Sequence, residues 1–571
     1  MPSKEKKDLE RGNTAQTVHS GLEAVERDRE DKPPFYLSKT ELKLLGISGV
    51  GFFLDAYDLF IINQVTVMLQ FVLYNGNALP AGLHGVVNAG ANIGSVIGQF
   101  SFGYLADAFG RKAVYGKELM IIIFATILTI SAPTGPLVRA GRPDDVLVWF
   151  IVWRIVLGIG VGADYPMSAS VSSDRVSIRK RGTMLAYVFS NQGWGSFVGS
   201  LATMITLAAY KHTMNDEGHV SRVDGVWRII VGISLIPAFA TLYQRLTLPE
   251  SKSYLRSQRR AKGIHSEDDN EVVDEIKAEK ERQKEEEESQ EREQREVNGT
   301  ITGSDTESES KKNGTTENAS VPPSPTVEGK GVKDAIIEKR GHASDFIHYF
   351  SEWRHARILI GTCLCWFLLD IAFYGINLNQ SVVLREIGFG GKGGTAWHQL
   401  WETAIGNLII TALGFVPGYY ATILTVEYLG RKWIQVQGFL MAALFLAILA
   451  GKFDSLSSAG FIVCFAFLQF FFNFGANATT YLYPAEVFPT RFRASAHGIS
   501  AACGKVGAII ASVGFNALSS KIGTPNVLWI FFSVCILGAC ATFLLPEVKG
   551  RDADLVDMEE LKEARDKGRV D

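Results

Sequence analysis

The chain has 571 residues, of which 47% are hydrophobic and 20% are charged, and its formal net charge is −3. Length alone would accommodate several soluble domains, but long apolar segments recur and short charged clusters separate them. This distribution excludes a soluble multidomain protein and predicts a chain that crosses the lipid bilayer many times. The charges are concentrated in tails and loops, so the net charge identifies no partner, and no nucleic-acid partner is expected.

Twelve apolar segments are long enough to cross a bilayer, and they fall into two groups of six. The first group lies in residues 36–250, with spans predicted at 43–74, 82–108, 113–133, 146–174, 183–211 and 225–247. The second group lies in residues 352–548, with spans predicted at 356–386, 400–428, 432–451, 457–487, 492–520 and 525–546. The predicted fold class is therefore an all-α membrane protein of twelve transmembrane helices in two pseudo-symmetric six-helix bundles.

Three polar segments lie outside these groups. Residues 1–35 and 549–571 are predicted as cytoplasmic tails, the first of them disordered. Residues 251–351 are predicted as a disordered cytoplasmic linker, because positions 251–350 hold 23 Asp and Glu and 17 Lys and Arg, a composition that cannot bury a core. Hydroxyls alternate with acids at 304–310, which suits phosphorylation by protein kinases and a regulatory role.

Lys and Arg are concentrated in alternate short loops, and this asymmetry sets the orientation of membrane helices. The loops after spans two, four, eight and ten are basic, and we expect them on the cytoplasmic side with both tails and the linker. Their basic residues are Arg111, Lys112, Arg175, Arg179, Lys180, Arg181, Arg431, Lys432, Arg491 and Arg493.

The two groups of spans repeat the same loop motif. The loop after the second span contains Asp107, Gly110 and Arg111, and the loop after the eighth span contains Glu427 and Arg431 at the same spacing. Such duplication predicts two similar bundles packed face to face, with a substrate site between them near the bilayer midplane.

The seventh span carries three polar side chains at intervals of four residues, namely Trp366, Asp370 and Tyr374. On a helix this spacing places them on one face, and a carboxyl at membrane depth usually faces a bundle interior or a water-filled path. A polar packing face between helices is the alternative. Lys505 places a positive charge far from both ends of the eleventh span, and a snorkelling lysine is the alternative there. One cation with several neutral donors suits a buried anion.

Carboxyl groups also mark the first half of the chain. Asp55 and Asp58 are three residues apart and share a face of the first span, and titratable groups inside apolar spans are what proton coupling requires. Glu118 lies nearer a helix end, where simple pairing with Lys117 or Arg111 is the alternative.

A glycine-rich stretch, Gly158-Ile-Gly160-Val-Gly162, lies within the fourth span. We interpret it as a helix-packing surface and not as a nucleotide site. No nucleotide-binding loop, metal-ligand cluster or catalytic triad is visible in the sequence, so neither a cofactor, nor a metal site, nor enzymatic activity is expected.

These motifs together resemble a known family. The loop motif at Asp107, its second copy, and Arg154 in Trp153-Arg154-Ile-Val-Leu-Gly look like the major facilitator superfamily. Four further features resemble its phosphate:proton symporters of fungi and plants: Phe52–Phe60 (FFLDAYDLF), Gly162–Ser168 (GADYPMS), the Trp366/Asp370/Tyr374 face, and Asn473–Thr480 (NFGANATT). The resemblance covers about residues 43–250 and 352–548, and the long acidic linker is more similar to that of the fungal members.

The resemblance implies roles for residues that match the family motifs. It implies a phosphate pocket made of Tyr165, Gln192, Trp366, Asp370, Tyr374, Asn477 and Lys505. It implies a proton path through Asp55, Asp58, Glu118 and Asp164. Gating and structural motif positions are Asp107, Gly110, Arg111, Arg154, Glu427 and Arg431. For Asp164, a purely structural ion pair with a basic residue such as Arg154 is the alternative.

The implied function is a proton-coupled symporter that imports inorganic phosphate across the plasma membrane by alternating access. Phosphate, protons and the lipid bilayer are the implied partners. Ala163, Met167 and Ala476 stand where the family pattern has Gly, Leu and often Pro, which leaves import of a glycerophosphodiester on the same scaffold as an alternative. A phosphate receptor that signals through the linker is a further alternative.

Overall fold

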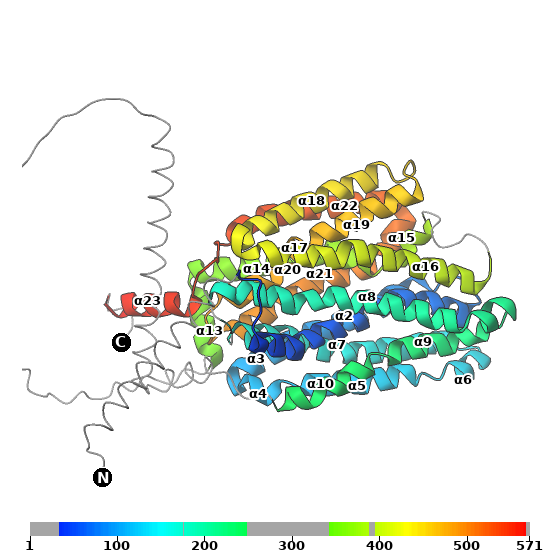
Figure 1. Ribbon diagram of the computed structural model, residues 1–571, viewed down its shortest axis with the longest axis horizontal. Helices are drawn as coiled ribbons and strands as arrows, with labels where there is room; N and C mark the ends of the chain where they lie inside the picture. Colours follow the sequence, from blue (N-terminus) through cyan, green and yellow to red (C-terminus); the bar gives the residue numbers. More distant parts are fainter. Residues whose placement is uncertain (1–32, 175, 177, 248–341, 387–393, 567–571) are drawn as a thin grey trace, which may run out of the picture. The chain divides into compact units, whose positions relative to one another are not determined.

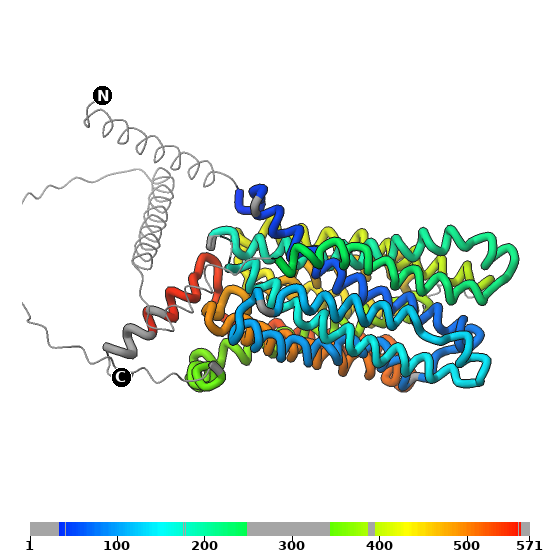
Figure 2. Tube along the Cα trace, turned by 90° about the horizontal axis from the view of Figure 1, so that it is seen from below, coloured from blue at the N-terminus to red at the C-terminus, as the bar shows by residue number. Residues whose placement is uncertain are grey.

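The computed structural model describes residues 33–174, 176, 178–247, 342–386 and 394–566. The chain divides into two compact units, one made of residues 1–255 with 346–571 and the other of residues 256–345. The described residues are helical, and the spanning helices of the first unit run side by side (Figure 1 and Figure 2). Most of the predicted N-terminal tail and linker, with the proposed phosphorylation tract, lie outside the described residues.

The first six predicted spans correspond to α2, α3, α4 with α5, α7, α8, and α9 with α10. The helices of this half are α2 (Lys39–Tyr74), α3 (Ala81–Phe109), α4 (Arg111–Val114), α5 (Lys117–Ile130), α6 (Thr134–Arg139), α7 (Pro143–Ser173), η1 (Ile178–Lys180), α8 (Arg181–Ala209), η2 (His212–Asp216), η3 (Val220–Arg222), α9 (Val223–Gly232) and α10 (Leu235–Leu246). Ser38 and Glu41 form a capping box at the start of α2, which satisfies backbone N–H groups of its first turn.

The last six predicted spans correspond to α14 with α15, α16 with α17, α18, α19 with α20, α21, and α22. The helices of this half are α13 (His342–Ser351), α14 (Trp353–Asn377), α15 (Gln380–Glu386), α16 (Ala396–Ile410), η4 (Thr411–Phe415), α17 (Val416–Leu429), α18 (Arg431–Gly451), α19 (Ser458–Asn473), α20 (Ala476–Val487), α21 (Arg493–Ile522), α22 (Thr524–Ala541), η5 (Thr542–Leu544) and α23 (Ala553–Asp566).

The twelve predicted spans are thus present as helical segments in the described part of the chain. Ten are long and apolar enough to cross a membrane by length and composition. The other two, α3 and α8, have 29 residues each but are rich in Gly, Ser, Asn and Gln. Both pack mainly against other helices, α3 against α7 and α21 and α8 against α2 and α17, so close packing inside the protein explains their small and polar residues.

Several predicted spans are interrupted instead of continuous, and two of the breaks have a visible local cause. Span 356–386 breaks after Asn377, where the Asn377 and Asn379 side chains donate to the carbonyls of Phe373 and Gly375, four residues back, at 2.7 and 2.9 Å. Such side-chain bonds compete with continuation of the helix. Span 457–487 breaks at Gly475, where the backbones of α18 and α20 meet closely enough that a Cβ atom on Gly475 would lie 2.4 Å from the Cα of Gly438.

The end of the spanning helices that carries the basic loops is called the basic-loop end here. α4, α13 and α23 lie at this end, and α6 and α15 lie at the opposite end (Figure 1). Within the predicted linker range 251–351, residues 342–351 form α13, whose Phe346 and Phe350 pack on Phe492 and Phe488. An aromatic pair at a spacing of four residues gives this segment a face that can be buried.

The glycines of the fourth span bring α7 against α3, as interpreted from the sequence. A Cβ atom on Gly158 would lie 2.0 Å from the Ala91 carbonyl oxygen, and one on Gly162 would lie 2.4 Å from that of Ser95. On the facing helix, a Cβ atom on Gly94 would lie 1.9 Å from the Ile155 carbonyl oxygen. No side chain fits at these crossings, so the glycines allow the two backbones to touch.

We therefore expect Gly158→Val to lower the melting temperature of the purified protein, because overpacking of this kind typically costs about 1–3 kcal/mol. The matched control is Gly46→Val, since a Cβ atom at Gly46 meets nothing within 4 Å. Thermal unfolding of both variants in the same detergent checks the expectation. Equal melting temperatures for the two variants would show that the α3–α7 crossing tolerates separation.

Candidate functional site

Lys505, Asp370 and Tyr374 meet in the interior between α14 and α21. The Lys505 ammonium donates to Asp370 Oδ2 at 2.9 Å and to the Tyr374 hydroxyl at 2.8 Å. All three residues are at most 2% exposed, so Lys505 does not snorkel to a helix end. The four-residue spacing of Asp370 and Tyr374 places both on the face of α14 that packs on α21, as the sequence predicts.

Trp366 extends the same face by one more turn. Its indole lies against α21 at Gly504, where a Cβ atom would come within 2.4 Å of Trp366 Cδ1. The indole ring is 6.4 Å from the Tyr165 ring of α7 and 5.5 Å from the His497 ring of α21. The absence of a side chain at Gly504 therefore leaves room for the indole to lie against the backbone of α21 next to Lys505.

A chain of hydrogen bonds crosses from the first half to the second beside Lys505. Gln192 Nε2 donates to the Tyr165 hydroxyl at 2.6 Å, and the Tyr419 hydroxyl donates to Gln192 Oε1 at 3.2 Å. Asn477 Nδ2 in turn donates to the Tyr419 hydroxyl at 2.8 Å. The Lys505 ammonium lies 5.3 Å from the centre of the Tyr165 ring, which joins this chain to the Lys505–Asp370 pair.

The structure thus brings together all seven residues that the resemblance assigns to one pocket, with contributions from both halves. It adds Tyr419 and Asn473, which accepts from Asn477 Nδ2 at 2.7 Å. Tyr419 stands beside Tyr420 in an apolar span, and the sequence carries no signal to choose between them. The structure does so, because Tyr419 is 1% exposed and Tyr420 is 38% exposed.

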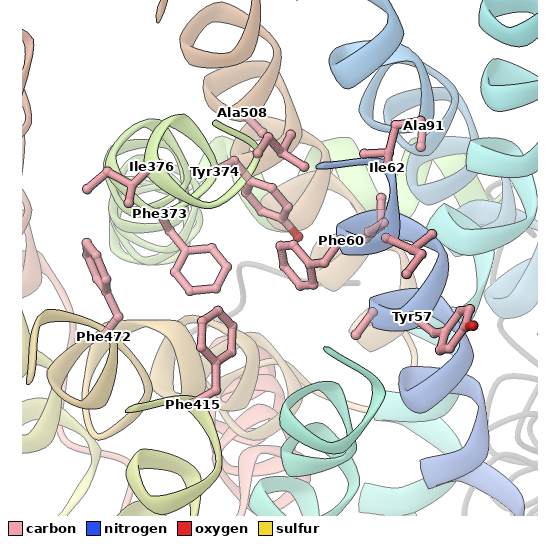
Figure 3. Packing of buried hydrophobic residues seen from close by; sticks show 14 of the residues in the cluster. Tyr57, Phe60, Ile62, Ala91, Phe373, Tyr374, Ile376, Phe415, Phe472 and Ala508 are labelled. Atoms are coloured by element: carbon pink, nitrogen blue, oxygen red, sulfur yellow. The ribbon is translucent and has the colours of Figure 1, made fainter. Parts of the chain in front are cut away.

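Aromatic rings close the pocket on the side away from the basic-loop end. The Phe60 ring stacks on the Tyr374 ring with centroids 5.9 Å apart and an interplanar angle of 16°. Phe373 and Phe415 complete the cluster, each with its ring centre within 6.1 Å of that of Phe60; Figure 3 shows these four rings turned toward one another. A small cavity of about 20 Å³ beyond this aromatic seal is lined mostly by polar side chains such as Asn63, Gln64 and Asn407.

Carboxylate side chains join the two halves at the basic-loop end. Asp107 accepts from the backbone N–H of Ser495 at 2.7 Å, in the first turn of α21, and Glu427 accepts from that of Thr183 at 2.9 Å, in the first turn of α8. Each carboxylate therefore satisfies the free N–H groups at the start of a helix from the opposite half. We call these two contacts the cross-caps.

Arginines hold each cross-cap in place. Arg431 pairs with Glu427 at 2.8 Å and with Glu486 at 2.7 Å. Arg111 lies 3.7 Å from Asp107 and 3.6 Å from Asp174, which also pairs with Arg493 of the second half. Gly110 and Gly430, with φ of +97° and +79°, form the corners that precede these arginines.

α23 packs on the loop that follows α20. Asp554 accepts from the backbone N–H and the hydroxyl of Thr490, both at 2.6 Å, and Asp557 accepts from Arg491 at 2.7 Å. Burial opposes ionisation of Asp554, but Arg493 and the Thr490 donors outweigh it, and the pKa of Asp554 falls below its usual value. This contribution to α23 docking is therefore present above the ordinary pKa of an aspartate and is lost as pH falls through the lowered one.

The four carboxyls of the implied proton path lie in the first half, and two of them pair with an arginine other than the basic residues weighed for them in the sequence. Asp164 pairs with Arg245 of α10 through two bonds of 3.1 and 3.0 Å, not with Arg154. Glu118 accepts from the same Arg245 at 3.0 Å, not from Lys117 or Arg111. Arg154 instead donates to the backbone carbonyl of Asp58 at 2.6 Å.

The chain is similar in sequence to known membrane transporters. A family model described as sugar (and other) transporter matches residues 45–306 and 334–559. A candidate inorganic phosphate transporter of Schizosaccharomyces pombe is 43% identical over 567 residues, with 96% of this chain and 94% of that protein covered. The inorganic phosphate transporter PHO84 of Saccharomyces cerevisiae is 35% identical over 540 residues, with 90% and 84% covered.

Solved structures agree on the fold. A structure of the proton:xylose symporter XylE, a protein of the major facilitator superfamily, superposes with a TM-score of 0.65 at 18% identity, covering 92% of this chain and 100% of the other. The arrangement of the helices is therefore that of the same fold. The chain belongs to the sugar (and other) transporter family within the major facilitator superfamily, and its relatives there include the inorganic phosphate transporters of fungi and plants.

Proposed function

We propose that the protein is a proton-coupled symporter that imports inorganic phosphate across the plasma membrane by alternating access. The observation that carries the proposal is the buried Lys505–Asp370–Tyr374 cluster next to the hydrogen-bond chain that begins at Tyr165. A buried anion needs one balancing charge and several donors, and this pocket provides both. Relatives named as an inorganic phosphate transporter and a phosphate permease, each covered over more than four fifths of its length, support the choice of phosphate.

In the proposed binding mode, Lys505 supplies the charge and the phenols, amides and indole of the pocket supply neutral donors. Asp370 next to an anion takes a proton from dihydrogen phosphate, or is protonated for part of the cycle. Tyr165 and Gln192 come from the first half, whereas Asn477 and Lys505 come from the second. A phosphate ion held by both sets would bridge the halves, which is what couples binding to a rearrangement of the bundles.

The proposed cycle opens one end of the pocket at a time. The aromatic seal around Phe60 and Tyr374 separates the pocket from the end that we assign to the outside. The cross-caps close the basic-loop end, which the excess of Lys and Arg assigns to the cytoplasm together with both termini. In this scheme the seal parts to admit phosphate and the cross-caps part to release it.

Coupling to protons has an energetic reason. A membrane potential of about 100 mV, negative inside, opposes the entry of one negative charge by roughly 2.3 kcal/mol. Protons that move inward with phosphate cancel that charge and add the energy of the pH gradient. Asp55, Asp58, Glu118 and Asp164 are the groups that we assign to this transfer.

Uptake of radiolabelled phosphate by the purified protein in liposomes tests the proposal. We expect accumulation that requires an inside-alkaline pH gradient and collapses when a protonophore is added. Unlabelled phosphate should compete with the label, and glycerophosphodiesters should not; the reverse order would establish the ester as substrate. Phosphate binding without any uptake would instead identify a receptor.

A further inference from the structure

Arg245, which the proton path read from the sequence does not include, is the centre of a buried group of charges. Its guanidinium bonds to Glu118 of α5 and Asp164 of α7 at 3.0–3.1 Å, and its Cζ atom lies 4.8 Å from the centre of the Tyr115 ring. Arg245, Glu118 and Asp164 are at most 1% exposed. Burial this complete keeps water from screening their interaction.

The backbone of α2 leaves space for the Arg245–Asp164 pair at Gly51. A Cβ atom on Gly51 would lie 1.8 Å from both Arg245 Nη2 and Asp164 Oδ2, so any larger residue at this position would displace the pair. Asp55 lies one turn further along α2 and is 0% exposed. Neither carboxyl oxygen of Asp55 has a hydrogen-bond partner among the described residues, although the charges of Asp164 and Arg245 act on it.

Negative charges outnumber positive charges around Arg245. Three carboxyls, those of Asp55, Glu118 and Asp164, face one guanidinium. The remaining charges nearby do not correct this excess: Asp58 adds a further acid whose backbone carbonyl accepts from Arg154, while Lys505 is bound to Asp370. With every acid ionised, the three carboxyls and Arg245 would carry a net charge of −2 without contact with water. An uncompensated buried charge costs several kcal/mol, so the group avoids this state by keeping protons.

Two atoms without hydrogen-bond partners in the described part of the chain indicate where the hydrogen bonds of this group can rearrange. Glu118 Oε2 and Arg245 Nε have no hydrogen-bond partner among the described residues, whereas Asp164 is held by Arg245 through two bonds and by the Ser168 hydroxyl at 2.7 Å. Arg245 Nη1 already contacts both Glu118 and Asp164. A proton gained by either acid therefore weakens that contact and leaves the guanidinium to the other.

We propose that Arg245 is the positioning residue of the proton path, a shared counter-ion that keeps one of Glu118 and Asp164 ionised while the group retains at least one proton. The inference rests on the proposed symport function. Asp164 precedes Tyr165, whose hydroxyl accepts from Gln192 in the phosphate pocket, so a change in the Arg245–Asp164 contact acts directly on a pocket residue. A purely structural role, in which Arg245 only ties α10 to α5 and α7, is the competing explanation.

The test compares Arg245→Gln with Arg245→Lys in the same liposomes. Without the guanidinium charge, the acids hold their protons to higher pH, so Arg245→Gln should lose proton-driven accumulation but keep phosphate–phosphate exchange. Its exchange rate should be half-maximal about one pH unit higher than in the wild type, a tenfold change in proton affinity. Arg245→Lys keeps the charge and should shift less. The control is Arg228→Gln, which removes a partly exposed ion pair to Asp224 on α9.

A second pair of variants covers the case in which Arg245→Gln fails to fold. Gly51→Ala retains every charge but displaces the Arg245–Asp164 pair, and it should shift the pH profile of exchange in the same direction. Gly46→Ala on the same helix meets nothing within 4 Å and should leave the profile unchanged. An unchanged pH profile in both Arg245→Gln and Gly51→Ala, with or without a lower melting temperature, would overturn the inference.

One measurement separates this inference from the proposed function. A protonated carboxylic acid absorbs in the infrared, and purified wild-type protein at neutral pH should show this band, reduced in Asp55→Asn and in Glu118→Gln. The band requires no transport. Its absence would overturn the inference, whereas a wild type that shows the band but accumulates no phosphate would overturn the symport function alone.

Discussion

Replacing Lys505 with alanine is expected to abolish phosphate binding while the protein still folds. Lys505 is the cation of the pocket and contacts Asp370 and Tyr374 directly. Its removal takes away the charge-assisted bond to the anion and leaves the Asp370 carboxyl to repel it. We expect the dissociation constant to rise more than tenfold, a loss of more than about 1.4 kcal/mol. Isothermal calorimetry with inorganic phosphate on the purified variant measures the change.

Two further variants make the Lys505 result specific. Lys521→Ala removes a lysine from the exposed last turn of the same helix and should leave affinity unchanged. Lys505→Ala combined with Asp370→Asn removes both partners of the buried pair, so it should recover melting temperature without recovering binding. A dissociation constant for Lys505→Ala within about threefold of the wild-type value would remove Lys505 from the pocket.

Asp55→Asn is expected to separate phosphate binding from proton coupling. An asparagine cannot take up or release a proton, so uphill accumulation should fail. Binding should persist, because Lys505 and the neutral donors of the pocket are untouched. Melting temperature should be equal to or higher than that of the wild type, because the change removes a buried carboxyl that has no hydrogen-bond partner among the described residues.

Asp164→Asn should differ from Asp55→Asn in its melting temperature. It breaks the two-bond contact with Arg245 and leaves a buried guanidinium under-compensated, so it should lower the melting temperature as well as accumulation. Asp454→Asn changes an exposed acid in the turn before α19 and serves as the control for both. Normal uphill accumulation by Asp55→Asn would remove Asp55 from the proton path.

Much of this architecture follows from local patterns in the sequence. Apolar segments of bilayer length predict the twelve spans, and the four-residue spacing of Trp366, Asp370 and Tyr374 predicts one helix face, because both signals are contained in a single helix. The pairing of Arg245 with Glu118 and Asp164 depends instead on contacts between different helices. Arg245 stands near the end of the sixth span, four residues before Pro249, where a sequence suggests only an arginine in the last turn of a helix.

Contacts between distant segments decide what the sequence leaves open. Arg154 and Arg245 both lie in predicted spans of the first half, and nothing in the residues next to them tells which one reaches Asp164. The packing of α10 against α2 and α5, with the space left by Gly51, selects Arg245. The break after Asn377 is similar, since an asparagine within an apolar run is compatible with either a continuous or an interrupted helix.

The cross-caps have a consequence for how the basic-loop end opens. Each half supplies a carboxylate to the third residue of a helix in the other half, Asp107 to Ser495 and Glu427 to Thr183. The arrangement is reciprocal, as in the isologous interface of a homodimer with twofold symmetry. A rigid rotation that moves the two halves apart at this end separates both contacts, so we expect both to break in the same step. Opening at this end is then an all-or-none event, and a change to either carboxylate should alter its frequency to a similar extent.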